Sequence, residues 1–192
     1  MAEHRILFVQ FVDTPGDLLL ADTDFLRQRA LGCVILREKF VQWWIKQPDR
    51  GRETFERAKN ALAQWRHYEM GWVELFPSAA SIEPGTNVAV LVRHMGFWSL
   101  NGCRVVYGVG DRHAGSSFGF AYGTLTNHAE LGEEIFEVRL EPESEAVIYR
   151  IQAVSRPHAA MAWIGYPIAR YFQERFRLDS TRALQRSIDV LA

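Results

Sequence analysis

The sequence predicts an α+β domain in which an antiparallel sheet of about six or seven strands carries a long C-terminal helix. Apolar residues recur at helical spacing in much of the first seventy positions, alternate with a period of two after Trp72, and return to helical spacing near the end. At 192 residues the chain is long enough for one domain with a full core. We expect one domain over 1–192: a mainly helical 1–70, a sheet in 71–157 and a helix in 158–192.

The N-terminal part is predicted to contain two helices and one ambiguous segment. Asp22 and Asp24 are suited to cap a helix that begins near Phe25. The apolar segment 34–45 fits either a strand or a helix, and a turn signal follows it at 47–51. An amphipathic helix is then predicted by apolar residues at helical spacing: Phe55, Ala58, Leu62 and Trp65.

Six strands are predicted after the helical part, joined by links short enough to favour antiparallel neighbours. Their ranges are 72–76, 87–95, 101–109, 117–125, 133–141 and 145–154. Alternation in the last two strands predicts one covered face and one wet face. We expect aromatic residues on the covered face, namely Phe120, Tyr122, Phe136 and Tyr149. We expect polar residues to face water, namely Glu137, Arg139, Arg150 and Gln152.

The strand Phe118–Leu125 has two very different faces. One face carries Phe118, Phe120, Tyr122 and Thr124, and the other carries mainly glycine and alanine. Such a strand suits a curved sheet whose aromatic side closes over a core or a ligand cavity. Its small side tolerates sharp twist or the close approach of another element.

The C-terminal segment is predicted to be the helix that covers this sheet. Pro167 is acceptable in a first turn, so the helix is expected from about that residue to the end. Its apolar residues continue from a segment before Pro167, in the order Ile164, Ile168, Phe172, Phe176, Ala183, Leu184, Ile188 and Leu191.

Composition excludes several function classes. The formal net charge is -1 and the basic residues are dispersed among acids, so the basic stripe of a nucleic-acid binder is absent from the sequence. The apolar run Ile6–Val12 lacks a cleavage site of small residues, and we interpret it as a strand or a buried arm. Cys33 and Cys103, the two cysteines, have no spacing typical of a zinc site or a disulfide framework. We expect a cytoplasmic protein with no membrane span, cofactor or metal.

Two polar motifs match patterns of catalytic sites. Residues 115–119 match the G-x-S-x-G pattern of a hydrolase nucleophile at Ser117, but a strand is predicted to follow where the elbow needs a helix. His128, Glu130, Glu133 and Glu134 fit a metal or acid–base site, or simply a polar hairpin. Because neighbours in a strand point to opposite faces, Glu134 is the inward member of the glutamate pair.

Arginine and tryptophan residues supply further candidates. Arg104 and Arg150 share the parity of the wet face, whereas Arg156 lies at the strand-to-helix corner and is the best single polar anchor. Trp72 and Trp98 either line a cavity or belong to the core. Trp98 is expected in a connection between strands, where an aromatic loop forms a lid or a partner patch.

The segment from Gly71 to Gln173 resembles a family of unknown function with plant and bacterial members. The resemblance rests on the run around Cys103–Tyr107, on GFAYGTL at 119–125, on Gly132-Glu-Glu134 and on Ser155-Arg-Pro157. That family looks like an outlying branch of the START-like, pollen-allergen-type helix-grip superfamily. The resemblance implies a curved sheet wrapped around a C-terminal helix and an apolar cavity, and it supplies no catalytic residues.

The fold analogy favours non-enzymatic binding or sequestration of a small apolar or amphipathic molecule. An enzyme acting in the same cavity through Glu134, Tyr122 or His128 stays an alternative, as does an interaction module built on the Trp98 loop. A perturbed carboxylate buried beside Tyr122 would favour the enzyme. The candidate cavity residues are Trp72, Trp98, Tyr107, Phe120, Tyr122, Glu134, Phe136, Tyr149, Arg156 and Phe172.

Overall fold

The structure is a computed structural model that describes most of the chain after residue 40. The described residues are 41–45, 51–94, 96–110, 115–125, 130–157 and 166–190. The expected arm Ile6–Val12, the helix near Phe25 and His128 all lie outside them.

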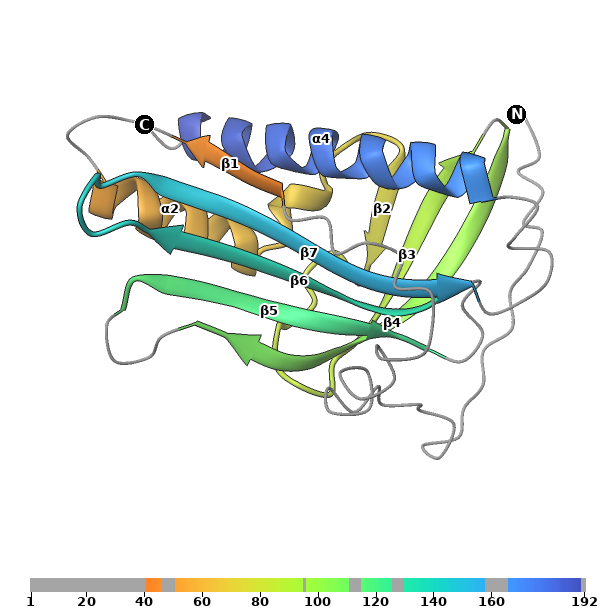
Figure 1. The fold of residues 1–192 in the computed structure, drawn as a ribbon. Helices are drawn as coiled ribbons and strands as arrows, with labels where there is room; N and C mark the ends of the chain where they lie inside the picture. The colour runs from red at the N-terminus through yellow and green to blue at the C-terminus, as the bar shows by residue number, and fades with distance from the viewer. Residues whose placement is uncertain are drawn as a thin grey trace.

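The described strands form one antiparallel sheet (Figure 1). Its strands are β1 Val41–Ile45, β2 Val73–Phe76, β3 Asn87–His94, β4 Phe97–Val109, β5 Ser117–Thr124, β6 Glu130–Leu140 and β7 Val147–Pro157. They lie side by side in the order β1-β7-β6-β5-β4-β3-β2, and β1 pairs with β7. The sequence left 34–45 open between strand and helix, and its last five residues are a strand.

The helices cover one face of this sheet. α2 spans Gly51–Ala63, the short 3-10 helix η1 spans Arg66–Tyr68, and α4 spans Tyr166–Val190. Figure 1 shows α4 running along the sheet with α2 beneath its C-terminal half, and α4 approaches α2 and η1 closely. Its 25 residues extend about 37 Å at 1.5 Å per residue. Among the described residues, neither α2 nor α4 is long and apolar enough to cross a bilayer.

The concave face of the sheet carries the aromatic residues that the period of two placed there. Phe120, Phe136 and Tyr149 are fully buried and Tyr122 is 8% exposed. They share one core cluster with Leu62 from α2, and with Leu184 and Ile188 from α4. The prediction of a buried aromatic face is therefore confirmed.

The glycine-rich face of β5 permits a close approach of β6. A Cβ atom on Gly119 would overlap the carbonyl oxygen of Phe136 and lie 2.9 Å from Cα of Glu137. Only a residue without a side chain fits there. A Cβ atom on Gly123, on the same face, meets nothing nearer than 3.8 Å.

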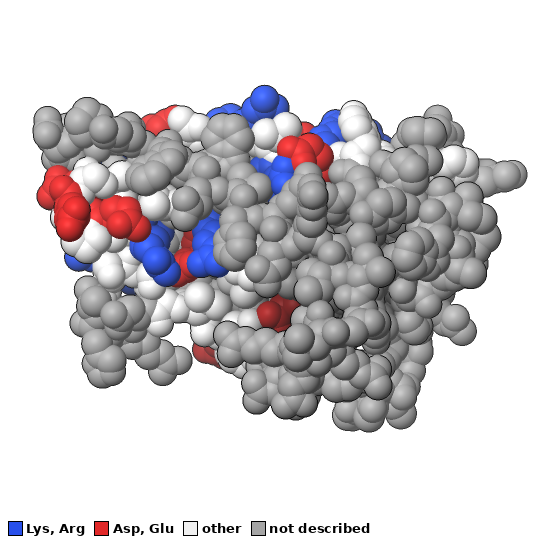
Figure 2. All heavy atoms as spheres, viewed as in Figure 1, with Lys and Arg blue, Asp and Glu red and all other residues white. Residues whose placement is uncertain are grey.

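The outer face departs from the expected wet face at Glu137. This residue is 4% exposed, although alternation predicted that it faces water. Its carboxylate pairs with Arg139 at 3.2 Å and with Arg150 at 3.5 Å. Figure 2 shows basic side chains (blue) beside acidic ones (red) over β6 and β7. The alternation of side chains along a strand identifies the face on which a residue lies but not the side chains that cover it. Here two long arginine side chains flank the carboxylate of Glu137. Arg139 is exposed as predicted, and Arg150 and Gln152 are half-buried.

Candidate functional site

A chain of hydrogen bonds crosses the aromatic interior of the grip formed by the sheet and α4. The Tyr122 hydroxyl donates to Oε2 of Glu134 at 2.6 Å. The hydroxyl oxygens of Tyr68 and Tyr122 lie 2.7 Å apart, and Tyr68 is the donor because Tyr122 has only one proton to give. Burial raises the pKa of both tyrosines well above the usual value, and the charge of Glu134 adds to the rise. Both tyrosines are therefore neutral donors at physiological pH.

The segment after α2 places Tyr68 in this chain. α2 ends at Ala63, and Trp65 takes a left-handed backbone conformation with φ of 58°. Its indole Nε1 donates to the carbonyl oxygen of Ala80 at 2.9 Å, which holds this turn in place. As a result η1 directs the side chains of His67 and Tyr68 into the core, where both are buried.

A second pair of hydroxyls lies deeper in the grip. The Tyr149 hydroxyl is 3.1 Å from Oγ of Ser180 on α4, and both residues are fully buried. Burial raises the pKa of Tyr149, so this group is also neutral. Together with Leu184 and Ile188, these residues define what we call the closed end of the grip.

The opposite end of the concave face is accessible to solvent, and we call it the open end. Ala153 shares the face of Tyr149 on β7 and is exposed. Glu134, its partner in the β6–β7 register, is half-buried, as are Phe172 and Phe176 on α4. Glu134, which accepts the hydrogen bond from Tyr122, therefore lies toward the end of the concave face where Ala153 is exposed.

Two aromatic candidates join α4 to the sheet near the open end. Trp72 is 4% exposed, and its Nε1 donates to Oδ2 of Asp179 at 2.9 Å while the Arg175 guanidinium lies 4.6 Å from its ring centre. Phe172 packs edge-on against His94, with ring centres 4.5 Å apart. Burial lowers the pKa of His94, whose Nε2 bonds to Oγ of Ser99 at 2.7 Å. Trp72 thus fastens α4 to the start of β2.

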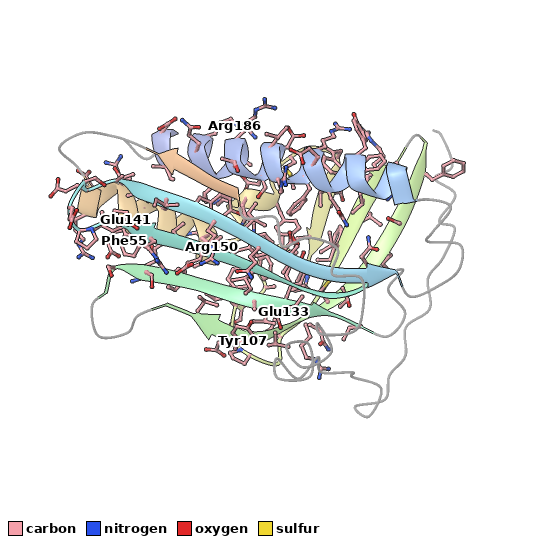
Figure 3. The ribbon with its side chains drawn as sticks, in the orientation of Figure 1. Phe55, Tyr107, Glu133, Glu141, Arg150 and Arg186 are labelled. Atoms are coloured by element: carbon pink, nitrogen blue, oxygen red, sulfur yellow. The ribbon has the colours of Figure 1, made fainter. Side chains whose placement is uncertain are left out.

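Tyr107 was predicted to face the interior and lies on the outer face instead. The register of β4 against β5 shifts between Val105 and Tyr107, which places Val105 opposite Tyr122 but Tyr107 opposite Ala121. Such a bulge reverses the alternation beyond it. The Tyr107 hydroxyl donates to Glu133 (Figure 3), and burial raises the pKa of this carboxyl. The prediction that Glu133 and Glu134 face opposite ways is confirmed.

The predicted position of Trp98 is also wrong. It lies in β4, opposite Arg93 in the β3–β4 hairpin, rather than in a connection between strands. The Arg93 guanidinium lies 6.0 Å from the centre of its ring. The turn of this hairpin is shorter than expected, because β4 begins at Phe97 and not at 101.

The remaining polar candidates, Ser117, Arg104 and Arg156, lie on β5, β4 and β7. Ser117 begins β5, so a strand follows it where a hydrolase elbow needs a helix. No group of three or more metal-ligating side chains is present in the described part of the chain. Arg104 donates to Oδ1 of Asn87 at 2.7 Å across β3 and β4. The backbone of Arg156 lies in β7 opposite Leu131, and its side chain is outside the described part.

Sequence reasoning missed His67, Tyr68 and Ser180. His67 is fully buried and packs against five aromatic rings, and burial lowers its pKa from 6.5 to about 3. The signal available was the cluster from Trp65 to Tyr68 between an amphipathic helix and a strand. The direction in which these side chains point depends on the left-handed turn at Trp65, and the spacing of apolar residues does not reveal such a turn.

Comparison with solved structures shows the fold. A crystal structure of a Thermus thermophilus protein aligns with a TM-score of 0.53 at 11% identity, over 81% of this chain and 99% of that one. A Thalictrum norcoclaurine synthase point mutant in complex with a transition-state analogue aligns with a TM-score of 0.51 at 9% identity, over 83% of this chain and all of that one. The chain has the START-like helix-grip fold that the resemblance implied.

Comparison of sequences shows the family. A UPF0548 protein of Dictyostelium discoideum is 36% identical over 146 residues, which are 72% of this chain and 68% of that protein. A UPF0548 protein of Arabidopsis thaliana is 32% identical over 143 residues, which are 73% and 69% of the two chains. The family model described as a domain of unknown function, DUF1990, matches residues 45–183. The chain therefore belongs to the DUF1990 family, whose relatives include these UPF0548 proteins.

Proposed function

We propose that this protein binds a small apolar or amphipathic molecule between the concave face of the sheet and α4. One observation carries the proposal: a hydrogen-bonded chain from Tyr68 through Tyr122 lies among aromatic rings and reaches Glu134 at the open end. A core that serves stability alone gains little from such a chain, because each polar group must be kept hydrogen-bonded away from water.

The two kinds of groups at the site suit the two parts of an amphipathic ligand. Phe172 and Phe176, which are half-buried, supply apolar ring surface from α4. The carboxylate of Glu134, which accepts a hydrogen bond from the Tyr122 hydroxyl, supplies a fixed hydrogen-bond acceptor beside these rings. Most small-molecule sites combine a mainly apolar lining with a few polar groups that orient the ligand.

A binding assay with a matched pair of variants tests the proposal. Tyr122→Phe removes the hydroxyl that donates to Glu134 in the interior, and Tyr107→Phe removes the equivalent hydroxyl that donates to Glu133 on the outer face. We expect the affinity for amphipathic probes such as 1-anilinonaphthalene-8-sulfonate or farnesol to change in Tyr122→Phe only. Equal effects of the two variants, or no binding by the wild type, would contradict the proposal.

The same hydrogen-bond chain favours a second candidate function, an enzyme in which Glu134 accepts a proton from a bound substrate. Glu134 places a carboxylate beside Tyr122, and this residue is half-buried rather than buried. Glu134→Gln separates the two functions, because it keeps a polar side chain of similar shape and removes the base. Turnover that disappears in Glu134→Gln while binding persists would favour the enzyme.

The buried Cys103 is a free thiol, and burial raises its pKa. A thiol of this kind is unreactive. It is compatible with the reducing cytoplasm that we propose as the location of the protein.

A further inference from the structure

His67 is the most unusual polar group in the described interior. Its side chain has no exposed surface, and neither Nδ1 nor Nε2 has a hydrogen-bond partner among the described residues. Buried polar atoms without partners are rare, and each one calls for an explanation. Leaving one unpaired costs about 1–3 kcal/mol, so a purely apolar residue would stabilise this position better.

The rings around His67 satisfy at most one of its two nitrogens. Its ring centre lies 4.6 Å from that of Phe136 and 5.8 Å from that of Trp65, and Tyr68, Phe120 and Tyr149 complete the enclosure. A ring face attracts an N–H group, because the face is electron-rich. It repels the lone pair of the other nitrogen for the same reason. The lone pair therefore requires an O–H or N–H donor.

The position of His67 connects it to the proposed ligand site. It precedes Tyr68, whose hydroxyl begins the chain to Glu134, and its ring lies 6.3 Å from that of Tyr149 at the closed end. Phe176 packs against both Tyr68 and Phe136, with ring centres 5.3 Å and 6.3 Å apart, and is only half-buried. Because Phe176 contacts two of the rings that enclose His67, displacement of Phe176 toward solvent is the access route that the inference below requires.

We propose that His67 is a second polar anchor of the ligand site and accepts a hydrogen bond from the hydroxyl of a neutral alcohol or phenol. The inference rests on the proposed function and narrows its ligand class. A hydroxyl matches a neutral imidazole because it offers the donor that the lone pair needs.

Acids and hydrocarbons are disfavoured by the same surroundings. An ionised carboxylate has no proton to donate, and a favourable pairing would require imidazolium. Burial lowers the pKa of His67 to about 3, so the ring stays neutral at physiological pH. Burying an unpaired carboxylate among these rings is also costly. A hydrocarbon leaves the lone pair unpaired.

Three probes with the same carbon skeleton test this selectivity: farnesol, farnesoic acid and farnesene. We expect the wild type to bind farnesol about tenfold more tightly than either of the others, which corresponds to one additional neutral hydrogen bond. His67→Phe keeps an aromatic ring and should abolish the preference by weakening farnesol alone. His94→Phe, which alters a half-buried histidine bonded to Ser99, is the control and should keep the preference.

The wild-type protein provides a test that does not depend on the folding of a variant. The ¹⁵N resonance of the unprotonated His67 nitrogen should shift upfield when farnesol saturates the site and should not shift with farnesene. An unchanged resonance at saturation, or a preference for farnesol that survives in His67→Phe, would overturn the inference while farnesol binding still supports the proposed function. Failure of all three probes to bind the wild type would overturn both.

Discussion

A neutral histidine inside an aromatic core makes the fold sensitive to acid. The unfolded chain binds a proton at His67 below pH 6.5, whereas the folded chain resists protonation until about pH 3. Because the unfolded state binds more protons in this window, the free energy of unfolding decreases as the pH falls through it. The full loss is roughly 5 kcal/mol, at about 1.4 kcal/mol for each pH unit.

Replacing His67 by phenylalanine should remove this pH dependence. Between pH 7 and pH 4 we expect the wild type to lose roughly 3 kcal/mol more stability than His67→Phe, as measured by urea denaturation at both pH values. An equal loss in the two proteins would show that the histidine is protonated in the folded state.

Ser117→Ala should leave any ester hydrolysis by the protein unchanged. The serine opens a strand and is not placed on a strand–turn–helix elbow. Steady-state rates on p-nitrophenyl esters check this. Loss of a measurable rate in the variant would assign Ser117 a catalytic role.

The strand β5 is held against β6 by a close contact between the two backbones. Gly119→Ala would place Cβ against the carbonyl of Phe136, whereas the Cβ of Gly123→Ala on the same face of the strand meets nothing nearer than Val106 at 3.8 Å. Since neither backbone can move without breaking the β5–β6 ladder, Gly119→Ala should cost about 1–3 kcal/mol or more. Gly123→Ala should change the free energy of unfolding by less than about 0.5 kcal/mol. Denaturation curves that show equal costs would contradict this packing.

Some side-chain positions in the strands and helices could be predicted from the sequence, and others could not. Alternation placed Phe120, Tyr122 and Phe136 on the concave face, because a period of two is a direct consequence of strand geometry. It failed at Tyr107, since one additional residue in β4 reverses every later position and no composition signal marks it. Spacing likewise counted Trp65 into the helix, although the left-handed turn there is what places His67 and Tyr68 in the site.

For the whole molecule, burial differs between the two ends of the grip. Ser180, Leu184 and Ile188 in the C-terminal half of α4 are fully buried. Phe172 and Phe176 in its N-terminal half are only partly buried. The length and apolar spacing of this helix followed from the sequence. The difference between its halves did not, because it depends on how closely the helix approaches the sheet at each end.

This difference predicts unequal costs for two ring truncations. Phe136→Ala at a fully buried position should cost about 3–5 kcal/mol. Phe172→Ala should cost less than half of that, because a partly exposed ring loses fewer dispersion contacts. Chemical denaturation of both variants measures the two costs. A full core-sized loss at Phe172 would mean that the open end is packed like the closed end.

Native mass spectrometry of the purified wild-type protein, followed by solvent extraction, tests the central claim of ligand binding most directly. We predict a mass above that of the chain alone and an extracted small molecule that carries a hydroxyl group on a mainly apolar skeleton. The extracted molecule should rebind to the wild type and more weakly to Tyr122→Phe. A chain with no bound molecule, which also gains no thermal stability from farnesol or related amphipathic compounds, would contradict the claim.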